Sequence, residues 1–226
     1  MTFSIIARCP RTGQFGMAVS SSSPAVASRC AFARAGVGVV ATQNITDPSL
    51  GPKGLELMAR GASAELCLQT LIEQTPYASY RQLSVIDCHG QTAQWSGSAT
   101  LGIHAMAKDV NVACAGNMLA DASIPRIMLD AFLQSDETQE LGQRLLIALN
   151  AGLTGGGEAG PVYSAGLVVV ADQSWPLTDL RVDWDDAPIE KLQQIWDVWS
   201  CQMHDYTQRA LAPAYSPSYG VPGDNG

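Results

Sequence analysis

A chain of 226 residues in which 46% are hydrophobic can bury a substantial core without disulfides, and its length favours a single domain. The net charge of −8 argues against a nucleic-acid partner, and the longest apolar run, residues 166–171, is too short to cross a bilayer. No basic, apolar leader segment opens the chain, so we expect a cytoplasmic protein that does not act at a membrane.

Hydrophobic periodicity and turn residues predict a hairpin at the start of the chain, with strands at 3–8 and 15–20 around a Pro- and Gly-containing turn. A serine-rich loop and a strand at 35–43 follow. Two helices are expected within 49–74, the first ended by Gly61 and the second capped by Ser63. The later elements are predicted strands at 82–87, 91–97 and 110–116, helices at 118–133 and 137–152, strands at 161–172 and 177–184, and a helix from about Pro188 to residue 212.

This order joins strands by hairpins and groups helices in pairs, so the strands cannot mostly be parallel crossovers. We therefore predict an α+β fold, a four-layer αββα sandwich of two antiparallel sheets flanked by helices. Residues 1–212 are expected to form this single domain. The Pro-, Gly- and Ser-rich residues 213–226 are expected to form a flexible C-terminal tail.

The last predicted helix carries an apolar side chain at every third or fourth position. A stripe this regular indicates packing against the core, and a subunit interface is the competing interpretation. The residues of the stripe are Ile189, Leu192, Trp196, Trp199, Met203, Tyr206 and Ala210.

Three motifs that could indicate a cofactor or a nucleophile lack the context they need. GGGEAG at 155–160 matches the dinucleotide fingerprint, but it follows a helix and enters a strand, so we interpret it as a flexible loop over a site. Cys88 and His89 are adjacent on a hairpin, point in opposite directions and cannot pair. The cysteines and histidines show no zinc-ligand spacing, so we expect free thiols, no metal and no cofactor.

Basic residues gather near the start of the chain. Residues 1–60 contain six Arg or Lys and two acidic residues, whereas residues 172–226 contain three basic and nine acidic residues. This asymmetry indicates either two differently charged surfaces or an N-terminal half that lines a site for a small anionic substrate.

Thr2 stands directly behind the first methionine. A methionine before a small residue is readily removed, which would leave Thr2 with a free α-amine of pKa about 7.7–8.0. Such an amine is a suitable general base at neutral pH, and the same residue carries a nucleophilic hydroxyl. The position therefore allows catalysis by an N-terminal threonine.

The opening strand, hairpin and second strand resemble the start of proteasome β-type subunits, which are N-terminal-nucleophile (Ntn) hydrolases with an αββα fold. The chain to about residue 185 also resembles an uncharacterised Ntn-hydrolase-like family of prokaryotic proteins. The motifs that carry this resemblance are MTFSIIAR, TGQFGMAVSS, ARAGVGVVATQNITDPSLGPKGLELM, QLSVID and AGNML.

The resemblance implies that Thr2 is the nucleophile. Asn44 follows the VVATQ strand and Asn117 lies in AGNML, so each is expected either to supply an oxyanion-hole donor or to hold substrate. Gln43, beside Asn44, is expected to bind substrate.

Ser22 and Ser23 stand where proteasome β-type subunits have an Asp that orients the terminal amine, and we expect them to line the substrate site. No acidic residue precedes Asp47, so the orienting role falls to hydroxyls or to a distant carboxylate. Arg29 and Arg34, in the basic segment, are candidates to hold a substrate carboxylate.

We expect an enzyme that hydrolyses non-peptide C–N bonds, an Ntn amidohydrolase. Its substrate would be a small, linear, anionic amide or ureido (N-carbamoyl) compound, cleaved through an acyl-enzyme on Thr2. The expected assembly is a homo-oligomer, a dimer or larger. The alternative is a non-catalytic binding or assembly protein on the same scaffold, because a fold does not fix a function.

Overall fold

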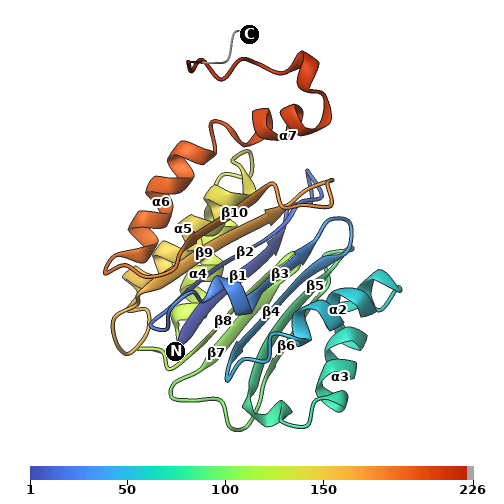
Figure 1. The fold of residues 1–226 in the computed structure, drawn as a ribbon. Helices are drawn as coiled ribbons and strands as arrows, with labels where there is room; N and C mark the ends of the chain where they lie inside the picture. Colours follow the sequence, from blue (N-terminus) through green and yellow to red (C-terminus); the bar gives the residue numbers. More distant parts are fainter. Residues whose placement is uncertain (223–226) are drawn as a thin grey trace.

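Two antiparallel sheets pack face to face between outer layers of helices in the computed structural model, which describes residues 1–222 (Figure 1). The larger sheet has the strand order β10-β9-β2-β1-β8-β7 and the smaller one the order β3-β4-β5-β6. The predicted α+β four-layer sandwich is therefore confirmed. The strands are β1 (Thr2–Arg8), β2 (Phe15–Ser21), β3 (Ala31–Arg34), β4 (Gly38–Asn44), β5 (Arg81–Asp87), β6 (Thr92–Ser96), β7 (Ala105–Asp109), β8 (Val112–Asn117), β9 (Ser164–Val170) and β10 (Thr178–Val182).

The helices cover the outer faces of the two sheets. Helices α4, α5 and α6 pack on the larger sheet, whereas α2 and α3 pack on the smaller one (Figure 1). The Ser63 hydroxyl accepts a hydrogen bond from the Leu66 N–H at 3.3 Å, as expected for a cap on α3. The helices are α1 (Ala27–Cys30), α2 (Leu50–Ala59), α3 (Ala64–Gln74), α4 (Ile124–Gln134), α5 (Leu141–Thr154), α6 (Pro188–Trp199) and α7 (Met203–Leu211), with short 3-10 turns at Ala78–Tyr80 and Pro213–Tyr215.

Strand β1 is buried on both faces because it lies inside the larger sheet. Phe3 and Ile5 contribute to the core under the helices, while Ile6 belongs to the hydrophobic layer between the sheets. Ser4 bonds to Gln43 of the opposite sheet. Since alternate residues of a strand share a face, Thr2 lies on the side of β1 that meets the smaller sheet.

The hairpins expected from turn residues are present. Strand β1 pairs with β2, β5 pairs with β6 and β9 pairs with β10, all antiparallel. Strands β3 and β7 and the one-turn helix α1 were not expected. Both strands are short and lie at sheet edges, where partial exposure weakens the alternation of polar and apolar residues.

The single long helix predicted from Pro188 is wrong, because the chain turns at residues 200–202 and divides into α6 and α7. The apolar stripe crosses this break, since Met203 is still buried against the larger sheet, so periodicity alone did not reveal the turn. Of the stripe residues, Ile189, Leu192, Trp196 and Met203 are buried in the core, which confirms core packing for them.

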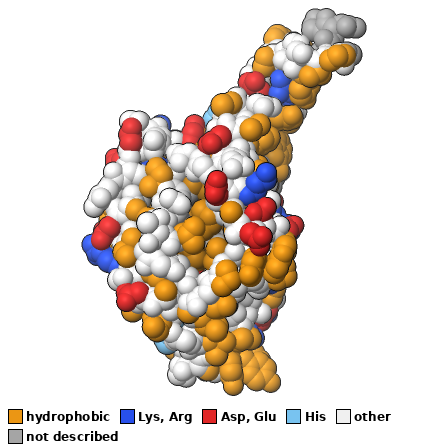
Figure 2. Space-filling view, turned by 90° about the vertical axis from the view of Figure 1, so that its left-hand side faces the viewer, with side chains coloured by type: hydrophobic (Ala, Val, Ile, Leu, Met, Phe, Trp, Pro, Cys, Tyr) orange, Lys and Arg blue, Asp and Glu red, His pale blue; other side chains and the backbone are white. Residues whose placement is uncertain are grey.

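Beyond α7 the chain projects from the body as an arm (Figures 1 and 2). Tyr215 and Val221 are exposed along it. The flexible tail predicted for residues 213–226 stays a prediction, and residues 223–226 of it lie outside the described residues. The predicted homo-oligomer stays a prediction.

All six cysteines are free thiols, as expected. Among residues 1–222, no helix has both the length and the apolar character that crossing a membrane requires.

Candidate functional site

Thr2 lies in a row of buried polar residues that crosses four adjacent strands. In the strand register Thr2 pairs with Asn117 of β8, and Ser21 of β2 pairs with Ser164 of β9. The hydroxyl oxygens of Thr2 and Ser21 are 3.5 Å apart, which joins the two pairs. Thr2 is only 5% exposed, and the other three residues are fully buried. Ser21 and Asn117 are the last residues of β2 and β8. Thr2 and Ser164 are the first residues of β1 and β9, so strand ends position all four side chains.

The Met1 carbonyl lies directly over this row. The Thr2 hydroxyl donates to the Met1 carbonyl oxygen, and the Ser21 hydroxyl donates to the same oxygen at 2.5 Å. The Met1 methyl group lies near Gly160, in the glycine-rich loop. Removal of Met1 would therefore leave the Thr2 amine beside the Ser21 hydroxyl, beneath that loop.

Glu158 is a buried acidic residue that contacts the chain next to this arrangement, and no local sequence signal marks it. Its side chain is 4% exposed, and both carboxylate oxygens accept from the Ser22 N–H at 3.2 Å. Burial raises the pKa of Glu158 to about 7, although the positive amino terminus of the chain and the bond from Ser22 act to lower it. Glu158 is thus a candidate for the distant carboxylate that the sequence analysis allows as the group orienting the terminal amine.

The glycine-rich loop brings Glu158 to the site from far along the chain. Glu158 forms an isolated bridge with Leu119, and the Ala159 N–H donates to the Met118 carbonyl at 2.9 Å. Residues 156 and 157 have φ values of +121° and +61°, which glycine adopts without strain. Glycines at 156 and 157 are therefore a backbone requirement of the turn that places this carboxylate, consistent with the interpretation of this segment as a loop over a site.

The serine-rich loop after β2, which contains Ser22 and Ser23, extends the polar row towards Arg29. Ser23 Oγ lies 2.8 Å from Ser21 Oγ and accepts from Arg29 Nη2 at 2.5 Å. Arg29 also donates to the carbonyls of Pro24 and Ala25. Among the residues that the structure describes, no carboxylate forms an ion pair with Arg29. Its guanidinium is thus held near the row by neutral acceptors, and its positive charge is available to an anion.

Arg34 lies elsewhere. It pairs with Gly38 at the turn of the β3–β4 hairpin, and its guanidinium is 3.4 Å from the Glu56 carboxylate. Gln43, which is linked to Asn117 of the polar row through Gln82, is five residues further along β4, a distance of about 17 Å for an extended strand. The structure therefore brings Arg29, but not Arg34, to the site.

Asn44 holds two loops together at the end of β4. Its side-chain amide donates to the Tyr80 carbonyl at 2.6 Å, and its oxygen accepts from the Leu101 N–H at 3.2 Å. Its φ of +73° fits the left-handed conformation that Asn tolerates better than most residues. These contacts do not join Asn44 to Thr2, so its role in an oxyanion hole stays a prediction.

A buried network of carboxamides underlies Asn117. Gln82 Oε1 accepts from Asn117 Nδ2 at 3.1 Å and from Gln43 Nε2 at 2.8 Å. Gln43 Oε1 accepts from the Ser4 hydroxyl at 2.7 Å. Gln82 and Ser4 were not nominated from the sequence, because nothing local distinguishes them from other polar strand residues.

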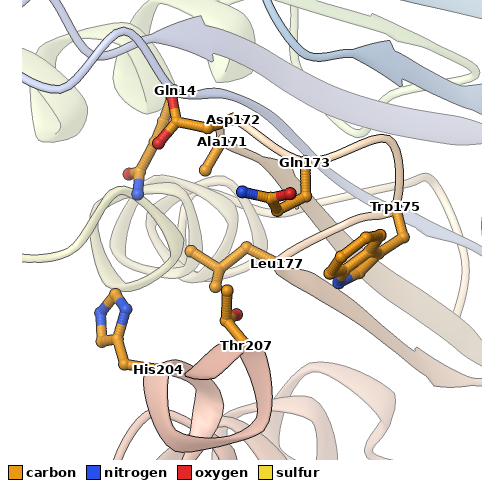
Figure 3. Close-up of a pocket in the computed structure, with 8 residues that line it drawn as sticks. All are labelled: Gln14, Ala171, Asp172, Gln173, Trp175, Leu177, His204 and Thr207. Atoms are coloured by element: carbon orange, nitrogen blue, oxygen red, sulfur yellow. The ribbon is translucent and has the colours of Figure 1, made fainter. Parts of the chain in front are cut away.

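The cavity in Figure 3 is a separate feature at the other end of the larger sheet. It has a volume of about 150 Å³ and is lined by residues that include Gln14, Asp172, Trp175 and His204 (Figure 3). Gln14 immediately precedes β2, whereas Ser21 ends it seven residues later, about 24 Å away. In the described part of the chain no group of three or more His, Cys, Asp or Glu could hold a metal ion.

Three comparisons place the chain among known proteins. Residues 2–192 match the sequence model described as "Family of unknown function (DUF1028)". The crystal structure of protein SPO2555 from Silicibacter pomeroyi, assigned to the same family model, is 29% identical, covers 92% of this chain and 90% of its own, and superposes with a TM-score of 0.84. Anbu (ancestral beta-subunit) from Yersinia bercovieri is 13% identical over 90% of this chain and 97% of its own, with a TM-score of 0.40. No curated protein matches.

Proposed function

The chain belongs to the family of unknown function DUF1028, and we propose that it is an Ntn amidohydrolase whose nucleophile is Thr2. One observation carries this proposal: the buried Thr2 hydroxyl begins a central strand beside the Ser21 hydroxyl, and a buried carboxylate, Glu158, accepts a hydrogen bond from the N–H of the next residue, Ser22. The reaction is hydrolysis of a C–N bond in a small, linear, anionic amide or N-carbamoyl compound.

The chemistry begins once Met1 has been removed. Thr2 Oγ attacks the substrate carbonyl carbon while the neutral α-amine of Thr2 accepts the hydroxyl proton. The C–N bond then breaks, the departing nitrogen takes that proton, and an ester links the acyl group to Oγ. Water attacks this ester, the amine accepts its proton and returns it to Oγ, and the carboxylic or carbamic acid leaves.

The surrounding groups have distinct roles in this scheme. The Glu158 carboxylate and the Ser21 hydroxyl orient the amine, since the first accepts from the Ser22 N–H beside the polar row and the second bonds to the Met1 carbonyl. Ser23 carries the polar row to Arg29, which attracts a substrate carboxylate. Backbone N–H groups, with Asn44, stabilise the oxyanion.

Replacement of the nucleophile tests the proposal. Thr2→Ala should abolish hydrolysis of every compound in a panel of N-carbamoyl and N-acyl amides that the wild type cleaves, whereas Thr2→Ser should retain part of it because the hydroxyl remains. Both purified variants should be checked for removal of Met1 by mass spectrometry. A Thr2→Ala protein that is as active as the wild type would contradict the proposal.

A further inference from the structure

Asn117 is the one residue of the polar row whose side chain ends in an unpartnered polar atom. The residue is fully buried, and its Oδ1 accepts no hydrogen bond from any residue in the described part of the chain. Leaving a buried acceptor unpaired costs about 1–3 kcal/mol. A buried acceptor without a donor, placed beside a candidate nucleophile, indicates that a bound ligand donates the missing hydrogen bond.

The carboxamide network fixes which atom of Asn117 is left over. Gln82 Nε2 donates to the backbone carbonyl of Gly116 at 3.0 Å and to the Ser96 hydroxyl at 2.8 Å. A backbone carbonyl can only accept, so the amino side of Gln82 must face it and Oε1 must point the other way.

Gln82 Oε1 is therefore an acceptor for its neighbours. Asn117 must present its amino group to that oxygen, as it does at 3.1 Å, which turns Oδ1 away from Gln82. Gln43 obeys the same polarity, since its Nε2 donates to Gln82 Oε1 and its Oε1 accepts from Ser4. The orientation of Asn117 thus follows from one backbone carbonyl and not from a free choice of rotamer.

The register places this acceptor next to the reacting hydroxyl. Asn117 and Thr2 are direct antiparallel partners, so their Cβ atoms are about 4.5–5.5 Å apart and on the same face of the sheet. A group that reacts with Thr2 Oγ can therefore reach Asn117 Oδ1 through an atom bonded to its carbonyl carbon.

We propose that Asn117 Oδ1 accepts a hydrogen bond from the scissile nitrogen of the substrate, which selects primary amides and terminal carbamoyl groups over acyl compounds without an N–H. This inference rests on the proposed function. As the nitrogen takes the proton from the Thr2 amine and leaves, its N–H bonds become stronger donors. The interaction therefore strengthens towards the transition state and accelerates C–N cleavage.

The test compares a primary amide with the methyl ester of the same acid. Asn117→Ala should lower kcat/KM for the amide roughly 10- to 100-fold and change ester hydrolysis much less, because the ester carries no N–H. Asn117→Asp should keep the preference for the amide, since a protonated carboxyl can donate to Gln82 and present its other oxygen to the substrate. Thermal unfolding of both variants checks that they are folded.

A further experiment uses only the wild-type protein, so its result does not depend on whether the Asn117 variants fold. The N-methyl amide, with one N–H, should be cleaved, and the N,N-dimethyl amide should not. Equal losses for amide and ester in Asn117→Ala, or rapid cleavage of the dimethyl amide, would overturn the inference and leave Thr2 as the nucleophile. If the wild type cleaves neither amide nor ester, the proposed function fails, and this inference fails with it.

Discussion

Thr2 and Asn117 are partners across β1 and β8, each at the end of its strand and each buried in the layer between the two sheets. The pairing means that a hydroxyl and a carboxamide are held by sheet hydrogen bonds and not by a loop. Sites built on strands hold their groups in more precise positions than sites on loops.

Glu158 should set the pH at which the enzyme becomes active. In the proposed mechanism its negative charge favours the protonated Thr2 amine, so Glu158→Gln should move the acid limb of the kcat/KM profile to lower pH by about one unit. The profile of the exposed Glu65→Gln variant should match that of the wild type. An acid limb that stays in place in Glu158→Gln would show that the carboxylate does not face the amine.

The same carboxyl group should make stability depend on pH. The pKa of Glu158 is about 7 in the folded chain and near its ordinary value of 4.5 when unfolded, so the folded state binds more protons between those limits. Its contribution is fully present below about pH 4.5 and is lost as the pH rises through 7. Relative to Glu158→Gln, the wild type should lose roughly 2–3 kcal/mol of unfolding free energy from pH 5 to pH 8. Urea titrations at both pH values measure this, and parallel curves would contradict the assignment.

Two arginines that look equivalent in the sequence should behave differently. Arg29→Gln should raise KM for a substrate that carries a carboxylate by about tenfold and leave a neutral analogue nearly unchanged, because the charge near Ser23 is lost. Arg34→Gln should affect neither substrate, since Arg34 pairs with Glu56 at the hairpin turn. Steady-state kinetics with the two substrates checks this, and equal effects of the two variants would refute the assignment.

The core assignment of α6 can be tested within one helix. Trp196 is 3% exposed, and its ring packs so closely on Gly142 of α5 that a Cβ there would lie 2.4 Å from the nearest ring atom. Trp196→Ala should lower the unfolding free energy by about 3–5 kcal/mol. Val198→Ala, at a position 64% exposed, should change it by less than about 0.5 kcal/mol. Similar losses in both variants would mean that the exposed face of α6 is also buried, as in an interface.

The fold could be predicted from the sequence wherever local signals were strong. The first hairpin follows from a Pro- and Gly-containing turn between two apolar runs, and the cap of α3 follows from Ser63. Strands β3 and β7 have no comparable signal, because they are short edge strands with mixed burial. The break after Trp199 was hidden by a stripe that continues on both sides of it.

The site could be predicted only in part, for a related reason. Thr2, Asn117 and Ser23 were nominated through a family resemblance, and the fold brings them together. Glu158 lies 136 residues from Ser22, so only the fold shows that it reaches the amino terminus. Gln82 was equally invisible, because its role depends on four partners on three other strands.

The central claim is that Thr2 is the first residue of the working protein and carries the acyl group. The most direct measurement is mass spectrometry of the N-terminal peptide after brief incubation with the methyl ester substrate and acid quenching. The expected peptide begins at Thr2 and carries one acyl group on the Thr2 hydroxyl. A peptide that still begins with Met1, or an acyl group on another residue, would contradict it.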